Sequence, residues 1–162
     1  MREPGTGNGP LIDIRIDEQD FEAGVWLAQL EALGGGAVAS FTGIVRGDDG
    51  LLAMQLDHYP AMTQAQVSRI VQQAQERWPL LGIVVIHRVG ALQPGERIVF
   101  VGTASSHRAA ALESCAFLID WLKSAAPFWK KEVYADGRAR WVEAKAEDED
   151  ARDRWILDQD RA

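Results

Sequence analysis

The order of apolar and polar residues along the chain predicts a mixture of strands and helices. Residues 11–16 alternate, with Ile12, Ile14 and Ile16 separated by charged residues, as in a half-buried strand. Other short runs rich in β-branched residues are bounded by glycine, proline or aspartate, which also indicates strands. These further predicted strands are residues 37–46, 51–58, 82–89, 97–104, 128–134 and 138–144.

Turn residues between these runs predict which strands pair. The Gly-Asp-Asp-Gly sequence at 47–50 predicts that the two strands beside it form a hairpin. A Gln-Pro-Gly-Glu turn at 93–96 joins the next two strands. Asp136-Gly137 is a strong hairpin signal between the last two.

Longer segments with helical spacing predict three main helices. Asp17 is the expected cap of a helix that runs to about Leu33 and stops at three glycines. The second helix begins at Pro60 and ends before Pro79, and the third spans about 107–124. The first helix should bury Phe21, Val25, Ala28 and Leu33, and the second Met62, Val67, Ile70, Val71, Ala74 and Trp78.

The predicted elements favour an α+β fold. Strands occur singly and as hairpins between helices, which indicates a mostly antiparallel sheet in a single domain. Residues 1–10 are expected to form a flexible tail, and residues 11–157 the domain, which closes with an acidic helix. A chain of 162 residues is long enough to bury a sizeable core without a disulfide or metal.

Composition narrows the classes of function. The single cysteine, Cys115, excludes a disulfide within the chain, and three histidines with one cysteine show no metal-ligand spacing, so we expect no metal or cofactor. The formal net charge of −7 disfavours nucleic-acid binding. No run reaches the length of a membrane span, and the first ten residues lack the apolar core of a signal peptide. We therefore expect a cytoplasmic protein.

Cations gather in one part of this acidic chain. His107 and Arg108 open the third predicted helix, Lys123 closes it, and Lys130 and Lys131 follow a Pro-aromatic turn. Free N–H groups at a helix start and an arginine fork both favour a phosphate or carboxylate, so this segment is a candidate site for a small anion.

Plainer explanations exist for each of these residues. Ser105 or Ser106 can cap the helix while Arg108 is solvated, and a lysine at a helix C-terminus is favoured by the helix dipole alone. Adjacent lysines on a strand point to opposite faces, so at most one of Lys130 and Lys131 is expected in a given pocket.

Three further polar residues are expected to be structural. His58 and His87 lie inside strand patterns and should pack or bond locally. Cys115 lies on the apolar face of the third helix with no cation within one turn to activate it, which predicts a buried, inert thiol.

Six segments, in order and at family spacing, resemble the large, catalytic subunit of molybdopterin synthase. They are Ser-Phe-Thr-Gly-Ile-Val-Arg at 40–46, His-Tyr-Pro-Ala-Met-Thr at 58–63, Val-Ile-His-Arg-Val-Gly at 85–90, Ser-His-Arg at 106–108, Ala-Pro-Phe-Trp-Lys-Lys-Glu at 126–132 and Arg-Trp-Val-Glu-Ala-Lys at 140–145. The resemblance covers the chain from about residue 37 to residue 145.

This resemblance implies a sulfur-transfer reaction. The family converts cyclic pyranopterin monophosphate, called precursor Z, into molybdopterin by inserting two sulfurs as a dithiolene. The donor is a thiocarboxylate at the C-terminal Gly-Gly of a small ubiquitin-like subunit, so the catalytic subunit needs no reactive cysteine. The implied assembly is a central homodimer with one small subunit at each end, a heterotetramer.

The resemblance also implies roles for single residues. Lys123 and Lys130 match the two lysines nearest the chemistry. The implied substrate-binding residues are Arg46, His107, Arg108, Lys131, Glu132 and Lys145. Lys145 stands at a basic position that some members fill with arginine, so it keeps the charge and loses the fork.

The resemblance implies that His107 and Lys123 both belong to the substrate site, and the length of the third helix then predicts that two chains share this site. Sixteen residue steps of about 1.5 Å separate the backbones of His107 and Lys123 by roughly 24 Å, which is too far for both to reach one pterin. In a two-fold dimer, His107 and Arg108 of one chain would meet Lys123 and Lys130 of the other.

Two other classes of function stay open from the residues. A non-catalytic module could bind a phosphorylated small molecule at the same helix start without converting it. A scaffold could dock a ubiquitin-like protein and would be unaffected by Arg108→Ala.

Overall fold

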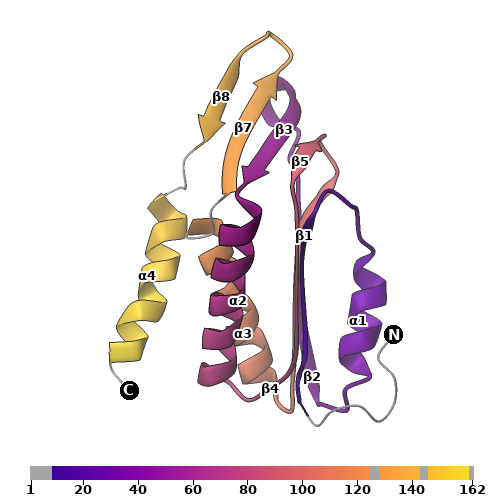
Figure 1. Cartoon of the computed structure of the whole chain (residues 1–162), viewed down its shortest axis with the longest axis vertical. Coiled ribbons are helices and arrows are strands. Elements are labelled where there is room, and N and C mark those ends of the chain that lie inside the picture. Colours follow the sequence, from indigo (N-terminus) through magenta and orange to yellow (C-terminus); the bar gives the residue numbers. More distant parts are fainter. Residues whose placement is uncertain (1–8, 125–127, 143–145, 161–162) are drawn as a thin grey trace.

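The computed structural model describes residues 9–124, 128–142 and 146–160. Within them the chain forms two four-stranded sheets and four α-helices, which confirms the α+β prediction (Figure 1). The expected tail lies mostly in residues 1–8, outside the described residues. No helix in the described part of the chain is both long and apolar enough to cross a membrane.

The first sheet has the strand order β1-β4-β6-β2. Its strands are β1 (Leu11–Asp17), β2 (Ala37–Ile44), β4 (Leu80–Arg88) and β6 (Arg97–Ser105). β1 runs parallel to β4, and the other two pairings are antiparallel, including the predicted β4–β6 pair. The central strands β4 and β6 are buried along most of their length, which explains why their sequences are nearly continuous apolar runs.

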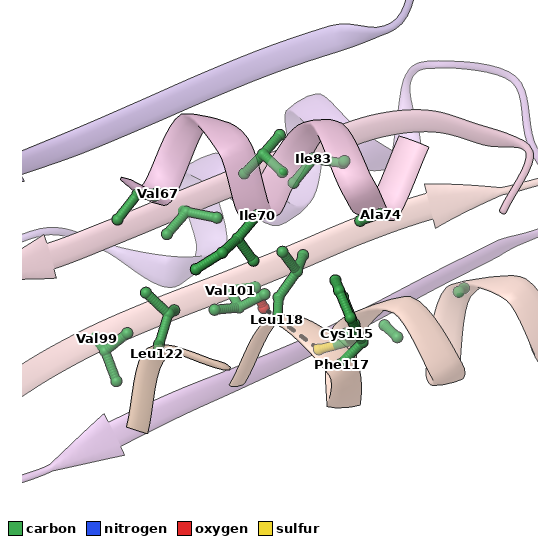
Figure 2. Packing of buried hydrophobic residues seen from close by; sticks show 14 residues of the cluster. Val67, Ile70, Ala74, Ile83, Val99, Val101, Cys115, Phe117, Leu118 and Leu122 are labelled. Carbon is green, nitrogen blue, oxygen red and sulfur yellow. Dashed lines mark hydrogen bonds between the residues drawn. The ribbon is translucent and has the colours of Figure 1, made fainter. Parts of the chain in front are cut away.

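Helices cover both faces of this sheet. Val84, Ile86 and Phe100 pack on the side of α1 (Ala23–Glu31), whereas Ile83, Val85 and Val101 pack on the side of α2 (Pro60–Arg77) and α3 (Arg108–Ser124). Alternate residues of one strand therefore enter two different cores. Figure 2 shows the larger core, where α2 and α3 meet the sheet.

The second sheet has the order β5-β3-β7-β8 and lies beyond one end of the first (Figure 1). Its strands are β3 (Leu51–His58), β5 (Gly90–Leu92), β7 (Phe128–Tyr134) and β8 (Ala139–Val142). All its pairings are antiparallel, and the predicted β7–β8 hairpin is confirmed. The β3–β7 register places His58 opposite Phe128 and Leu56 opposite Lys130.

The predicted hairpin of residues 37–46 and 51–58 is wrong. β2 pairs with β6 in the first sheet, whereas β3 pairs with β5 and β7 in the second. Between them, a short 3-10 turn (Asp48–Gly50) has positive φ at Asp49 and Gly50 and carries the chain from one sheet to the other. A Gly-Asp-rich turn favours a reversal of the chain but does not decide which strand each end meets.

The first predicted helix starts too early. Asp17 ends β1, and its carboxylate accepts a hydrogen bond from the backbone N–H of Gln19 at 3.0 Å in the loop before α1. The buried face of α1 is Trp26 and Leu30, whereas Val25 is 53% exposed. Phe21 packs on Phe100 before the helix begins, so its apolar character belongs to the loop.

The other helices follow the predicted segments. α2 starts with Pro60 in its first turn and buries Val67, Ile70, Val71 and Ala74, although the predicted Met62 is exposed. The acidic tail forms α4 (Ala146–Asp160), which lies against α3. Its Trp155 donates its indole N–H to Asp120 at 2.7 Å.

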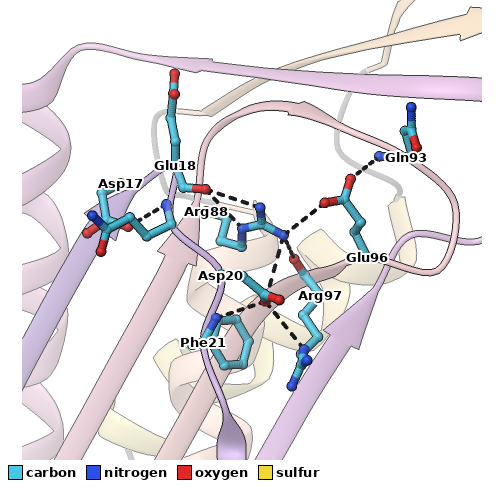
Figure 3. A network of polar contacts seen from close by, with 9 residues as sticks. Asp17, Glu18, Asp20, Phe21, Arg88, Gln93, Glu96 and Arg97 are labelled. Atoms are coloured by element: carbon cyan, nitrogen blue, oxygen red, sulfur yellow. Dashed lines mark hydrogen bonds and ion pairs between the residues drawn. The ribbon is translucent and has the colours of Figure 1, made fainter.

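A buried arginine ties together the loops at the end of the first sheet that faces the second (Figure 3). Arg88, with only 9% of its side chain exposed, donates hydrogen bonds to the carbonyl oxygens of Glu18 and Arg97 at 3.0–3.2 Å. Its guanidinium also lies 3.8 Å from the carboxylate of Asp20 and 3.5 Å from that of Glu96. One side chain therefore joins the β1–α1 loop to the β5–β6 turn.

Replacing this arginine by methionine should destabilise the fold. Arg88→Met removes three charged hydrogen bonds to backbone carbonyls, so we expect a loss of about 2–4 kcal/mol in the free energy of unfolding. Urea denaturation measures this loss. Arg138→Met is the matched control, because that side chain is 72% exposed and its ion pair should contribute less than about 1 kcal/mol. Equal stability of the two variants would show that Arg88 does not stabilise the fold by joining these two loops.

Candidate functional site

The charges of two lysines from different elements reach one buried histidine. Lys123 is in the last turn of α3, and Lys130 is in β7, the next described element along the chain. Their positive charges both act on the ring of His87, which is the penultimate residue of β4. These are the two lysines that the resemblance implies to be nearest the chemistry, and in the structure both act on the same buried ring.

The position of His87 is set by two contacts. Its ring stacks on that of Phe128, with centroids 3.9 Å apart and planes 13° from parallel. Its Nδ1 lies 2.8 Å from the backbone carbonyl oxygen of Arg88. Phe128 begins β7, so the stacking joins the first sheet to the strand that carries Lys130.

The ring of His87 is held in its neutral form. Burial lowers the pKa of His87 from 6.5 to about 4, because a charged ring would lose its hydration. The Arg88 carbonyl favours the charged form, but the charges of Lys130, Lys123 and His58 oppose it. The expected local packing of His87 is confirmed. Sequence patterns did not indicate that the charges of the two lysines act on this ring, because the lysines lie some 35–45 residues further along the chain.

The alternation of β7 separates the two adjacent lysines. Lys130 shares a face with Phe128 and lies opposite Leu56, which is buried. Lys131 lies on the other face, where its Nζ sits 5.8 Å from the centre of the Trp141 ring. Only Lys130 of this pair therefore lies on the face that carries Phe128.

Glu132 lies on the same face of β7 as Lys130 and is engaged within the second sheet. Its carboxylate accepts a hydrogen bond from the Tyr134 hydroxyl and lies 3.4 Å from the guanidinium of Arg140. The carboxylate raises the pKa of Tyr134, because it accepts that hydroxyl proton. These contacts fix the carboxylate two residues beyond Lys130.

Arg46 follows β2 and is exposed, with its guanidinium 3.6 Å from Asp48. The backbone beside it is held firmly, because Val45 exchanges two hydrogen bonds of 2.9 Å with the 93–96 turn, one with Gly95 and one with Glu96. Val45 is buried among apolar residues of the second sheet. The structure therefore places Arg46 at the junction of the two sheets.

His107 and Arg108 lie at the opposite end of α3 from Lys123 and are exposed. α3 is continuous from Arg108 to Ser124, so roughly 24 Å of helix separates the two groups within one chain. This separation is the premise of the predicted shared site.

Two glycines before β2 allow the backbone to pass close to the residues just before His107. A Cβ atom added to Gly35 or Gly36 would lie 2.5 or 2.4 Å from the carbonyl oxygen of Ser105 or Ser106, so only glycine allows this close approach. Ser105 does not cap the helix, because its hydroxyl donates to the carbonyl oxygen of Pro79 at 2.8 Å. In the sequence these glycines indicated only the end of a helix. Lys145, the remaining candidate, lies outside the described residues.

Cys115 differs from these candidate residues because its thiol is buried and unreactive. Its thiol lies in the core between α3 and the first sheet, 3.8 Å from the carbonyl oxygen of Val101 (Figure 2). Burial raises the pKa of Cys115 to about 12, so the nucleophilic thiolate is scarce at neutral pH. In the described part of the chain, no three His, Cys, Asp or Glu side chains are grouped to hold a metal ion.

Replacing this thiol should leave intact the sulfur transfer that the resemblance implies. We expect Cys115→Ala to retain turnover and to lose about 1 kcal/mol of stability from the smaller side chain. Product formation and melting temperature, measured on the same preparation, check this. Loss of activity in a folded Cys115→Ala protein, or a persulfide trapped on Cys115 of the unmodified protein, would show that the thiol carries sulfur.

Several known proteins are similar to this chain in sequence and fold. The family described as MoaE protein matches residues 16–125. Molybdopterin synthase catalytic subunits from Brucella melitensis and Mesorhizobium japonicum are 48% and 51% identical, over 89% and 88% of this chain and 91% and 92% of theirs. The solved structure of the molybdopterin biosynthesis MoaE protein from Burkholderia ambifaria is 45% identical, with a TM-score of 0.76 over 90% of this chain and 98% of that one. The chain therefore belongs to the MoaE family of molybdopterin synthase catalytic subunits.

Proposed function

We propose that this chain transfers sulfur from the C-terminal thiocarboxylate of a small ubiquitin-like subunit to precursor Z, forming the dithiolene of molybdopterin. The family membership supports this reaction, and so does a solved relative from Staphylococcus aureus described as molybdopterin synthase, which is 27% identical with a TM-score of 0.71. The inert Cys115 agrees with a sulfur atom that arrives on a partner.

One structural observation supports the proposed reaction between two anions. Lys123 and Lys130, from a helix end and a strand, both act on the buried ring of His87 on an otherwise acidic protein. The phosphate of precursor Z and the thiocarboxylate are both anions, which repel each other. A pair of cations offsets that repulsion and stabilises charge that develops during transfer.

The remaining candidates have binding roles in this proposal. Arg108 has the fork geometry that suits a phosphate, and His107 stands beside it at the helix start. Arg46, Lys131 and Lys145 add positive charge, and Glu132 helps to fix β7 through its contacts with Tyr134 and Arg140. Lys123 and Lys130 act nearest the reacting atoms, where they orient the thiocarboxylate and move protons.

The working assembly in this proposal is a homodimer with one small subunit at each end. The length of α3 supports a site built from two chains, since it separates His107 from Lys123 within one chain. We further propose a cytoplasmic location, because a thiocarboxylate and a dithiolene need a reducing compartment.

Reconstitution with purified components tests the function. The protein, precursor Z and the thiocarboxylated small subunit should together yield molybdopterin, detected by conversion to its fluorescent oxidation product. The control contains the same small subunit ending in an ordinary carboxylate, and it should give none. Binding of precursor Z without turnover would instead support the non-catalytic module, and partner binding unaffected by Arg108→Ala, also without turnover, would support the scaffold.

A further inference from the structure

One nitrogen of the His87 ring is hydrogen-bonded to the backbone. Nδ1 lies 2.8 Å from the carbonyl oxygen of Arg88, and a carbonyl oxygen can only accept, so Nδ1 carries the hydrogen. A neutral imidazole has a single N–H, which leaves a bare lone pair on Nε2. Nε2 is at the edge of the ring farthest from the backbone of its own residue, so this acceptor is directed away from the backbone of β4.

The surroundings of this acceptor are cationic. Phe128, which stacks on the ring, is two residues before Lys130 on the same face of β7. The other groups whose charge acts on the ring are Lys123 from α3 and His58 from β3. The guanidinium of Arg88 is turned away toward Glu18 and Glu96.

We propose that His87 is a positioning residue whose Nε2 accepts a hydrogen bond from the ammonium group of Lys130 and aims that group at the reacting anions. Lys130 is chosen over Lys123 because it shares a strand face with the ring that stacks on His87, and its charge acts on His87 more strongly. An ammonium has three N–H donors, so a lysine held through one of them can still donate to a phosphate or thiocarboxylate oxygen. The inference rests on the proposed function.

A neutral ring is essential to this role. A protonated imidazole has two N–H groups and no acceptor, so it would repel Lys130 instead of holding it. Burial of His87 and the nearby cations keep the pKa of the ring near 4, which is below any pH at which the enzyme would work. The aromatic contact with Phe128 then fixes the direction of the lone pair.

Nitrogen NMR tests the geometry without any turnover. In protein labelled with 15N-histidine, the signals of His87 are assigned by their absence from His87→Gln. We expect a protonated Nδ1, an unprotonated Nε2, and no change between pH 7.5 and pH 5.5. A ring protonated at Nε2, or one that titrates in this range, would overturn the proposal.

Three variants separate the acceptor from the packing of the ring. His87→Phe keeps an aromatic ring for stacking and removes both nitrogens, whereas His87→Gln can place an amide oxygen near the position of Nε2. Ser114→Ala is the matched control, since it also removes one buried hydrogen bond to a backbone carbonyl but lies in the middle of α3. Each variant is assayed for kcat, KM and melting temperature in the reconstituted reaction.

We expect kcat of His87→Phe to fall roughly tenfold to a hundredfold, because the Lys130 ammonium is no longer oriented by Nε2. KM for precursor Z should change little. His87→Gln should recover part of this loss, and the alkaline limb of the kcat profile of His87→Phe should move to lower pH. Unchanged kcat in His87→Phe would overturn the proposal. So would losses that follow melting temperature alone, with no recovery in His87→Gln. Absence of turnover in the unmodified protein would instead contradict the proposed function. The NMR test of the His87 ring does not depend on turnover, so it would still decide the protonation of the two ring nitrogens.

Discussion

Replacing either Lys123 or Lys130 by alanine is expected to lower turnover by roughly 10²- to 10⁴-fold, the range for loss of a group that transfers protons. Stability should change by only about 1 kcal/mol or less, because Lys123 is exposed and Lys130 is half-buried, with one proposed hydrogen bond to His87. Single-turnover formation of molybdopterin and the melting temperature, measured together, check both statements.

Lys131→Ala provides the matched comparison for these variants. It removes the same charge from the neighbouring residue of β7, but on the opposite face, beside Trp141. Its effect on turnover should therefore be smaller than that of Lys130→Ala by at least about tenfold, since a charge on the other face of β7 reaches the site only through screened, long-range electrostatics. Full activity in both Lys123→Ala and Lys130→Ala would remove these lysines from the site.

Mixing two inactive variants is expected to restore activity. When His107→Ala and Lys123→Ala chains exchange subunits, one of the two sites in each heterodimer receives both unmodified groups if the site is shared. With equal amounts and free exchange, half of the dimers are mixed, so about a quarter of the unmodified activity should return. The measurement is turnover after co-refolding or prolonged incubation of the two proteins.

A second mixture controls for non-specific rescue. His107→Ala and Arg108→Ala change the same end of α3, so every shared site in their heterodimer still carries one defect. This mixture should show no recovery. Subunit exchange is proved independently by co-purification of differently tagged chains. If exchange is complete and the first mixture also stays inactive, both ends of α3 do not serve one composite site in the way proposed.

Much of the fold could be predicted because it depends on local chemistry. The alternation in 11–16 identifies β1, and Asp136-Gly137 identifies the β7–β8 turn, where Gly137 has φ of 88°. The proline at the start of α2 and the apolar stripe behind it identify that helix. The candidate cations were found in the same way, as charges whose positions the fold alone did not require.

Only the tertiary structure decided which elements meet. The sequence by itself determined most strands and helices and the inert character of Cys115, and it predicted a site for small anions. It did not determine that β2 and β3 belong to different sheets, that β1 pairs in parallel with β4, or that α1 begins after Phe21. It also could not show that the charges of Lys123 and Lys130 act on His87, because periodicity reports only which face of an element is apolar. Which faces then pack together depends on burial and shape across segments that are far apart in the chain, and here that packing set the direction of a histidine lone pair.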